Sequence, residues 1–216
     1  MIDLYTWTTP NGRKVSIMLE EAGLPYRVFP IDINSNEQFD PGFERISPHN
    51  KIPAIVDQDN GFHLMESGAI LMYLAHKTGK LMPPEGESYW RVIEWLMFQM
   101  GNLGPMLGQT HHFVRHHPDK SEYAKERYLK ENRRLYKVMD TRLADREYLA
   151  GDYSIADIAS WPWISRFEWQ TMDLNDYPSL KRWYLNIAER PAVVRGYHVP
   201  HKVQELPVPE PTPGAR

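Results

Sequence analysis

The pattern of apolar residues changes near Gly86, and this change limits the folds that the chain can adopt. Before it, short β-type runs alternate with helical stretches, whereas the later residues show long helical patterns and no convincing strand. A proline-rich segment separates the two regions. We therefore predict an α+β fold with a mixed-sheet domain over 1–80, a linker over 81–86, an all-helical domain over 87–199 and a proline-rich tail over 200–216.

The first region contains the patterns of four strands and three helices. In residues 11–22, apolar residues spaced three and four apart mark one face of a helix. The charged residues of this helix, Arg13 and Lys14 among them, take the other face. Gly23 ends this helix, and Asn60-Gly61 predicts a hairpin turn. The expected strands are 2–5, 26–33, 53–56 and 62–65, and the expected helices are 11–22, 40–46 and 66–77. This order, βαβαββα, predicts a small mixed sheet with helices packed on it.

The second region is expected to be helical. Residues 87–116 form an apolar helix whose glycines and proline between 101 and 108 predict a kink. A charged amphipathic helix covers 121–144. Ser154 and Asp157 have the spacing of a capping box, so we assign Asp157 to fold stability. The tail contains five prolines and little apolar mass, which predicts an extended or disordered segment.

Composition excludes several kinds of function. The net charge of -3 argues against nucleic-acid binding, which usually requires a basic face. The chain has no cysteine, which excludes disulfides, zinc–thiolate sites and a protein thiol nucleophile. Adjacent histidines in the pairs His111-His112 and His116-His117 point about 100° apart on a helix, so we predict no metal site. No leader pattern opens the chain and no run approaches the ~18 apolar residues that span a bilayer, so we expect a cytoplasmic location.

The turn Thr9-Pro10-Asn11-Gly12 joins the first strand to the first helix. The first N–H groups of a helix have no partner within it, and the helix dipole adds to their attraction for an anion. A ligand thiolate at this turn would be stabilised, with further hydrogen bonds from the Thr9 hydroxyl and the Asn11 amide. Thr9 and Asn11 are also good capping residues, and on this motif alone capping is the favoured interpretation.

Two further motifs lie later in the same region. A cis bond between Ile52 and Pro53 would turn the Ile52 backbone groups toward a peptide-like ligand, although an ordinary trans proline at a strand start is the commoner case. Glu66 and Ser67 open a helix directly after a strand. The Glu66 carboxylate could hold an ammonium group and Ser67 a carboxylate, whereas an acid in a first helical turn is also commonplace without any ligand.

Together these motifs resemble those of the glutathione transferases, and more specifically of the bacterial nu class, which is related to a fungal nitrogen-regulating prion protein. The resemblance covers residues 1 to about 200. The segments that carry it are Thr9 to Gly12, Glu44 to Pro48, Asn50 to Asp57, Glu66 to Ile70, 101–113 and Gly151 to Asp157.

The resemblance implies a thioredoxin-like first domain and glutathione, reduced or oxidised, as a bound co-substrate. Trp7 stands near the place of the tyrosine that activates the thiol in many transferases, and Thr9 stands where others have a serine. Thr9 and Asn11 are therefore the predicted catalytic residues. The implied glutathione contacts are Asn11, Gln38, Lys51, Ile52, Pro53, Glu66, Ser67 and Arg127.

Nu-class similarity also implies a homodimer that reduces small disulfides, with glutathione as the redox pair and no protein cysteine. Weak peroxidase or conjugating activity on electrophiles is consistent with the same site. A second hypothesis is a regulatory protein that keeps the glutathione site but has lost useful chemistry. Tight glutathione binding without turnover would favour that alternative.

Overall fold

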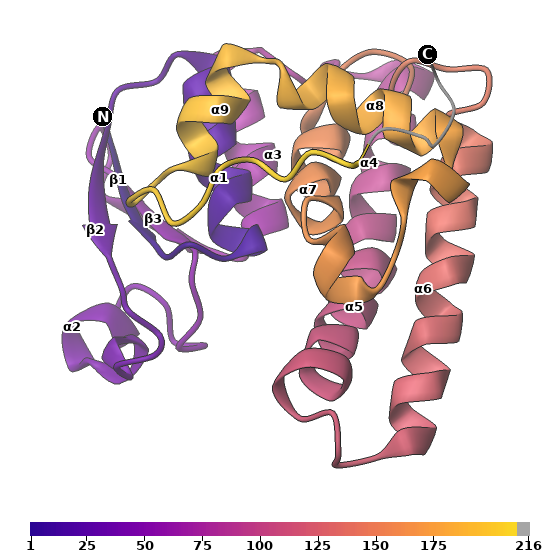
Figure 1. Cartoon of the computed structure of the whole chain (residues 1–216). Helices are drawn as coiled ribbons and strands as arrows, with labels where there is room; N and C mark the ends of the chain where they lie inside the picture. The colour runs from indigo at the N-terminus through magenta and orange to yellow at the C-terminus, as the bar shows by residue number, and fades with distance from the viewer. Residues whose placement is uncertain (211–216) are drawn as a thin grey trace. The chain divides into compact units, whose positions relative to one another are not determined.

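The computed structural model describes residues 1–210, which divide into two compact units (Figure 1). The first unit consists of Met1–Tyr89 and Glu189–Glu205. The second consists of Trp90–Ala188 and, within the described residues, 206–210. We expected 87–199 to form one helical domain, but the structure groups its last residues with the first unit.

A four-stranded sheet forms the centre of the first unit. Its strands are β1 (Ile2–Thr6), β2 (Tyr26–Pro30), β3 (Ala54–Asp57) and β4 (Phe62–Met65). Their spatial order is β2-β1-β3-β4, in which β1 and β2 are parallel and the other two pairings are antiparallel. The helices are α1 (Pro10–Ala22), the short η1 (Glu37–Phe39), α2 (Pro41–Glu44) and α3 (Ser67–Thr78). The predicted order of a thioredoxin-like domain is confirmed.

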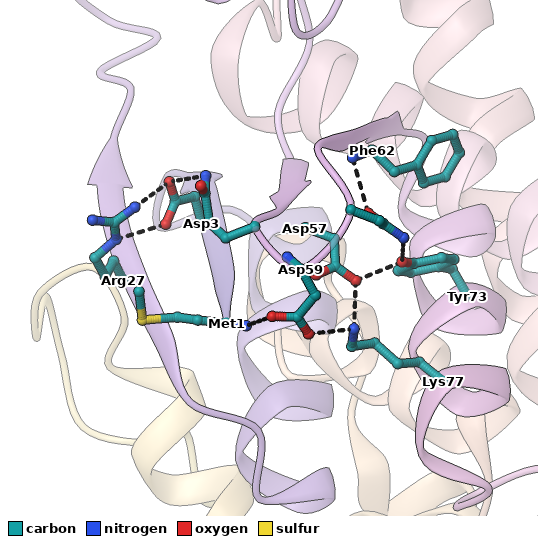
Figure 2. Close-up of polar contacts among 10 residues, drawn as sticks. Met1, Asp3, Arg27, Asp57, Asp59, Phe62, Tyr73 and Lys77 are labelled. Atoms are coloured by element: carbon teal, nitrogen blue, oxygen red, sulfur yellow. Dashed lines mark hydrogen bonds and ion pairs between the residues drawn. The ribbon is translucent and has the colours of Figure 1, made fainter.

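A polar network ties the far end of α3 to the hairpin between β3 and β4 (Figure 2). Lys77 Nζ lies 2.7 Å from a carboxylate oxygen of Asp57 and 2.7 Å from one of Asp59. The Tyr73 hydroxyl donates to Asp57 at 2.5 Å. Burial acts to raise the pKa of Asp57, but the hydrogen bonds from Lys77 and Tyr73 outweigh it, so the net pKa lies below the usual range.

We predict that replacing Lys77 destabilises the protein in a pH-dependent way. Because the folded-state pKa of Asp57 is lowered, the ion pair stabilises the fold above the unfolded-state pKa of about 4 and loses that effect as pH falls further. Lys77→Met should therefore lower the urea midpoint at neutral pH. Its difference from the wild type should be smaller near pH 3, and should shrink further toward the Asp59 pKa of about 2, because Lys77 also pairs with Asp59. Lys125→Met is the control, since its bond to Glu122 is exposed. Equal losses at both pH values would contradict the prediction.

The helix α9 (Pro191–Tyr197) packs against α1 (Figure 1). The two backbones approach so closely that a Cβ on Gly196 would lie 2.6 Å from the Ile17 Cα atom. The Ser16 hydroxyl donates to the Gly196 carbonyl at 2.6 Å. This packing is why 189–205 belongs to the first unit, and sequence periodicity carried no signal for it.

The charged side of α1 is consequently buried, which corrects a sequence expectation. The periodicity puts Arg13 and Lys14 on the face opposite the apolar one, where exposure is expected, but they are 0% and 1% exposed. Arg13 Nε donates to the Tyr197 carbonyl at 3.0 Å, and the guanidinium carbon lies 3.6 Å from the centre of the Tyr197 ring. The neighbouring α9 and α3 therefore determine the surroundings of these side chains, and the local sequence does not.

Helices make up the second unit (Figure 1). They are α4 (Gly86–Phe98, whose start lies in the first unit), η2 (Gln99–Leu103), α5 (Gly104–Thr110), η3 (His111–His116), α6 (Glu122–Arg142), α7 (Ile155–Ile164), η4 (Phe167–Gln170), η5 (Leu174–Asp176) and α8 (Pro178–Ala188). Where a kink was expected, the helix changes to a π-helical segment, η2, before α5, and a second such segment, η3, follows α5. Within the described residues, no helix is both long enough and apolar enough to cross a bilayer. Residues 201–210 of the tail form neither helix nor strand, and 211–216 lie outside the described residues.

Asp157 anchors the core of the second unit. The predicted capping box with Ser154 is present, and the carboxylate also accepts from the Leu149 N–H at 3.0 Å and from Trp183 Nε1 at 2.8 Å. Burial raises the pKa of Asp157 to about 6 against the lowering effect of these hydrogen bonds, so the group is ionised at neutral pH.

We predict that Asp157→Asn lowers the free energy of unfolding by about 2–4 kcal/mol at neutral pH. The amide would turn an N–H donor toward backbone and indole donors that now share a carboxylate. Urea unfolding measures the loss, with Asp152→Asn as an exposed control. A cost no greater than that of the control would show that the acid is not a structural anchor.

Candidate functional site

Strand register brings the three sequence motifs to one end of the sheet. Tyr5 of β1 pairs with Ala54 of β3, and Ala54 pairs with Met65 of β4. The turn that follows β1, the proline that precedes β3 and the acid that follows β4 therefore leave the sheet at the same edge. Backbone pairing thus gathers three segments that are far apart in the chain.

The first of these segments, the β1–α1 turn, is tightly built. Thr9 is the N-cap of α1, and its side-chain oxygen accepts the Gly12 N–H at 3.2 Å, which confirms the capping interpretation for Thr9. Asn11 lies in the first helical turn and is half-buried. A Cβ on Gly12 would lie 2.2 Å from the Trp7 carbonyl oxygen and 2.4 Å from Thr6 Oγ1, so this position requires glycine.

Gly12→Ala should therefore force the turn apart. We expect a loss of about 1–3 kcal/mol in the free energy of unfolding, as for overpacking elsewhere in proteins. Gly101→Ala is the matched control, because nothing lies within 4 Å of a Cβ added there. Denaturant unfolding of both variants compares them, and equal stabilities would contradict the close packing of the turn.

The second segment is the loop that leads into β3. The Ile52–Pro53 peptide bond is cis, the conformation that the sequence left open. Asn50 Nδ2 donates to the Gln38 carbonyl at 3.1 Å, so η1 lies beside this loop. Gln38 Oε1 is buried and has no hydrogen-bond partner among the described residues. Lys51 is exposed, and its carbonyl accepts from the Ser47 hydroxyl at 2.8 Å. Four of the predicted contact residues thus lie close together here.

The third segment is the junction between β4 and α3. Glu66 has φ 70° and ψ 112°, a backbone conformation that non-glycine residues rarely adopt. Such outliers cluster at functional sites, because the surrounding structure must hold them in place. The Glu66 side chain is exposed, whereas Ser67, the first residue of α3, is 4% exposed.

Sequence reasoning missed a fourth component, Lys14. Its ammonium group donates to Ser67 Oγ at 3.1 Å, which links α1 directly to the start of α3. Burial lowers the pKa of Lys14 to about 7, while the charge of Glu66 acts to raise it. A charged residue in an amphipathic helix indicates an exposed face, so no local signal in the sequence could have identified it.

Another contact comes from the described part of the tail. The rings of Trp7 and His201 meet edge to face, with their centres 5.1 Å apart. Trp7 directly precedes the β1–α1 turn, so the tail lies beside the site. The sequence left the course of the tail open.

Arg127 belongs to the second unit. It is exposed on α6 and lines a groove of about 710 Å³ together with Tyr123 and Tyr128. Its contact with glutathione therefore stays a prediction.

The histidine-rich segment of the second unit is packed among aromatic side chains. His111 stacks on Trp163 with ring centres 5.8 Å apart and lies 3.1 Å from Gln170 Nε2. Burial, followed by the charge of Arg166, lowers the pKa of His111 to about 4, so the ring is neutral at pH 7. Among residues 1–210, no group of three acidic or histidine side chains is arranged to hold a metal ion.

Comparison with known proteins shows the family to which this chain belongs. The chain matches the models "Glutathione S-transferase, N-terminal domain" over residues 1–76 and "Glutathione S-transferase, C-terminal domain" over residues 105–191. It is 50% identical to the disulfide-bond oxidoreductase YfcG of Escherichia coli K12, a match that covers 89% of this chain and 92% of that protein. It is also 32% identical to the protein URE2 of Candida albicans, over 87% of this chain and 67% of that protein.

A solved structure is also similar to this chain. A glutathione transferase from Burkholderia graminis, crystallised with two glutathione molecules per subunit, is 43% identical, with a TM-score of 0.87 over 92% of this chain and 88% of that chain. The chain belongs to the glutathione S-transferase family, and the resemblance indicated by its motifs is confirmed.

Proposed function

We propose that the protein is a glutathione-dependent disulfide-bond reductase in which bound glutathione supplies the reactive sulfur. The observation that carries this proposal is the meeting of the three motifs at one sheet edge in a chain without cysteine. The 50% identity to a disulfide-bond oxidoreductase supports the reaction class, and the relative with two glutathione molecules per subunit supports the redox pair.

In this proposal the β1–α1 turn stabilises the glutathione thiolate. The positive end of α1 faces the sulfur, and the Thr9 hydroxyl and Asn11 amide supply hydrogen bonds. Thr9 Oγ1 accepts a hydrogen bond from the Gly12 N–H, so the hydroxyl hydrogen of Thr9 is left to donate to the sulfur. Both effects favour the ionised thiol and lower its pKa, which raises the thiolate fraction at neutral pH.

The remaining segments hold the rest of the tripeptide. The backbone of Ile52, next to Pro53, pairs with the cysteinyl part as an added strand would. Lys51 directly precedes Ile52, and Gln38 lies beside this loop through the hydrogen bond from Asn50 to its carbonyl. At the other end, Glu66 binds the γ-glutamyl ammonium group and Ser67 its carboxylate.

The chemistry is thiol–disulfide exchange. The glutathione thiolate attacks one sulfur of the substrate disulfide, forms a mixed disulfide and releases the other sulfur as a thiolate that takes up a proton. A second glutathione thiolate then attacks the glutathione sulfur of the mixed disulfide. Oxidised glutathione forms and the second substrate thiol leaves, so two glutathione thiols are oxidised for each disulfide reduced. The same site allows weak peroxidase or conjugating activity.

Turnover of 2-hydroxyethyl disulfide with reduced glutathione tests the proposal. We expect rates well above the uncatalysed exchange, and a loss of about ten- to a hundredfold in kcat/KM for Asn11→Ala, because one hydrogen bond to a charged atom is removed. Asn34→Ala, an exposed residue of the same unit, is the control. The thiolate absorbance of bound glutathione at varied pH should show a raised thiol pKa in Asn11→Ala alone. Rates equal to the uncatalysed exchange would refute the proposed reaction.

The alternative function is a glutathione-binding regulator with little activity, and the similarity to URE2 is the observation that favours it. Tight glutathione binding without turnover of any disulfide or hydroperoxide would decide for this alternative.

A homodimer in the cytoplasm completes the proposal. Trp90 and Met97 of α4 are 66% and 47% exposed and offer an apolar surface, whereas Trp95 of the same helix is buried. Light scattering of the purified protein measures the assembly.

A further inference from the structure

Lys14 is an unusual residue for the interior of a small sheet domain. It lies in the middle of α1, is 1% exposed, and is among the largest fully buried side chains of the described structure. Removing an ammonium group from water is unfavourable unless nearby groups compensate. A methionine or glutamine would fill similar space without that cost, so packing alone does not explain a lysine here.

The contact made by Lys14 points to the start of α3. Its ammonium donates to Ser67 Oγ at 3.1 Å, so the positive charge lies directly behind the hydroxyl. A hydroxyl oxygen that accepts from a cation is a stronger donor through its own hydrogen, because hydrogen bonds in a chain polarise one another. Ser67 also begins α3, where the helix dipole adds positive potential.

We propose that the buried charge of Lys14 is part of carboxylate recognition at Ser67, acting as a positioning residue that strengthens binding of the γ-glutamyl carboxylate without touching it. This inference rests on the proposed function, since it takes that carboxylate to be the ligand group at Ser67. It extends the site by a residue that the sequence motifs do not contain.

The charged groups around Lys14 determine how its protonation, and therefore ligand affinity, depends on pH. The charge of Glu66 acts on Lys14 and favours its protonated form. Arg13 on the same helix is engaged by the Tyr197 carbonyl and ring. The other acids on or beside α1 are paired with arginines, as Asp3 is with Arg27, Glu20 with Arg195 and Glu21 with Arg190. Because the pKa of Lys14 lies near 7, a bound carboxylate should favour its protonated form, and affinity should fall as pH rises through neutrality.

Calorimetry with S-methylglutathione tests the proposal, because its sulfur does not titrate. The comparison ligand is γ-aminobutyryl-S-methylcysteinylglycine, which keeps the amino group but lacks the γ-glutamyl carboxylate. Near pH 6 we expect Lys14→Met to weaken S-methylglutathione about tenfold and to leave the comparison ligand unchanged. Near pH 8 the difference should shrink to about twofold, because most of the wild-type Lys14 is then neutral before binding.

A second variant separates charge from hydrogen bonding. Lys14→Gln keeps a donor for Ser67 but has no charge, so we expect it to behave as Lys14→Met. Lys77→Met, at the other end of α3, is the control and should bind both ligands as the wild type does. Circular dichroism melting of each variant confirms that it is folded before binding is measured.

The outcomes separate a failure of this inference from a failure of the proposed function. If the wild type binds neither ligand, the proposed glutathione site is wrong, and this inference falls with it. If the wild type binds S-methylglutathione but Lys14→Gln binds it equally well, the charge has no role, and only the inference is overturned. Equal weakening of both ligands by Lys14→Met would mean a structural role and would also overturn it.

Discussion

The pairing of β1 with β3 and of β3 with β4 is the constraint on which the site depends. Because Tyr5, Ala54 and Met65 lie in one row across the sheet, the segments next to them leave the sheet at one edge. A shift of one residue in either pairing would turn the buried side chains of β3 toward the opposite face. The same apolar contacts that stabilise the sheet therefore also fix the positions of the segments that we propose to bind glutathione.

Each of the three segments adjoins the end of a strand or a helix. This placement suits the chemistry of a protein without cysteine. A borrowed sulfur has to be held by groups that do not move when its charge changes. The N-terminus of α1, the loop before β3 and the strained Glu66 backbone are each fixed by an adjoining strand or helix. Preorganised donors of this kind stabilise a developing anion without reorganisation during the reaction.

Local features of the sequence predicted most of the fold. Glycine at position 23, the capping box at Ser154 and the turn at Asn60-Gly61 act through neighbouring residues, so their patterns could be read directly. The three motifs of the site were also visible, although only the register shows that they meet. Features set by distant segments could not be read in this way. The packing of α9 on α1, the place of His201 beside Trp7 and the burial of Lys14 all depend on residues far apart in the chain.

Arg13 and Lys14 show how two adjacent buried cations can differ in role. Arg13 donates to the Tyr197 carbonyl and lies on the Tyr197 ring, partners that suit a weakly hydrated, permanently charged guanidinium and that attach α9 to α1. Lys14 instead faces Ser67 with a compact charge whose pKa burial lowers into the physiological range. A fixed charge suits a structural contact, whereas a charge that can be gained on ligand binding suits a recognition site. If Lys14 acts as proposed, these adjacent residues divide structure and recognition between two directions about 100° apart on one helical turn.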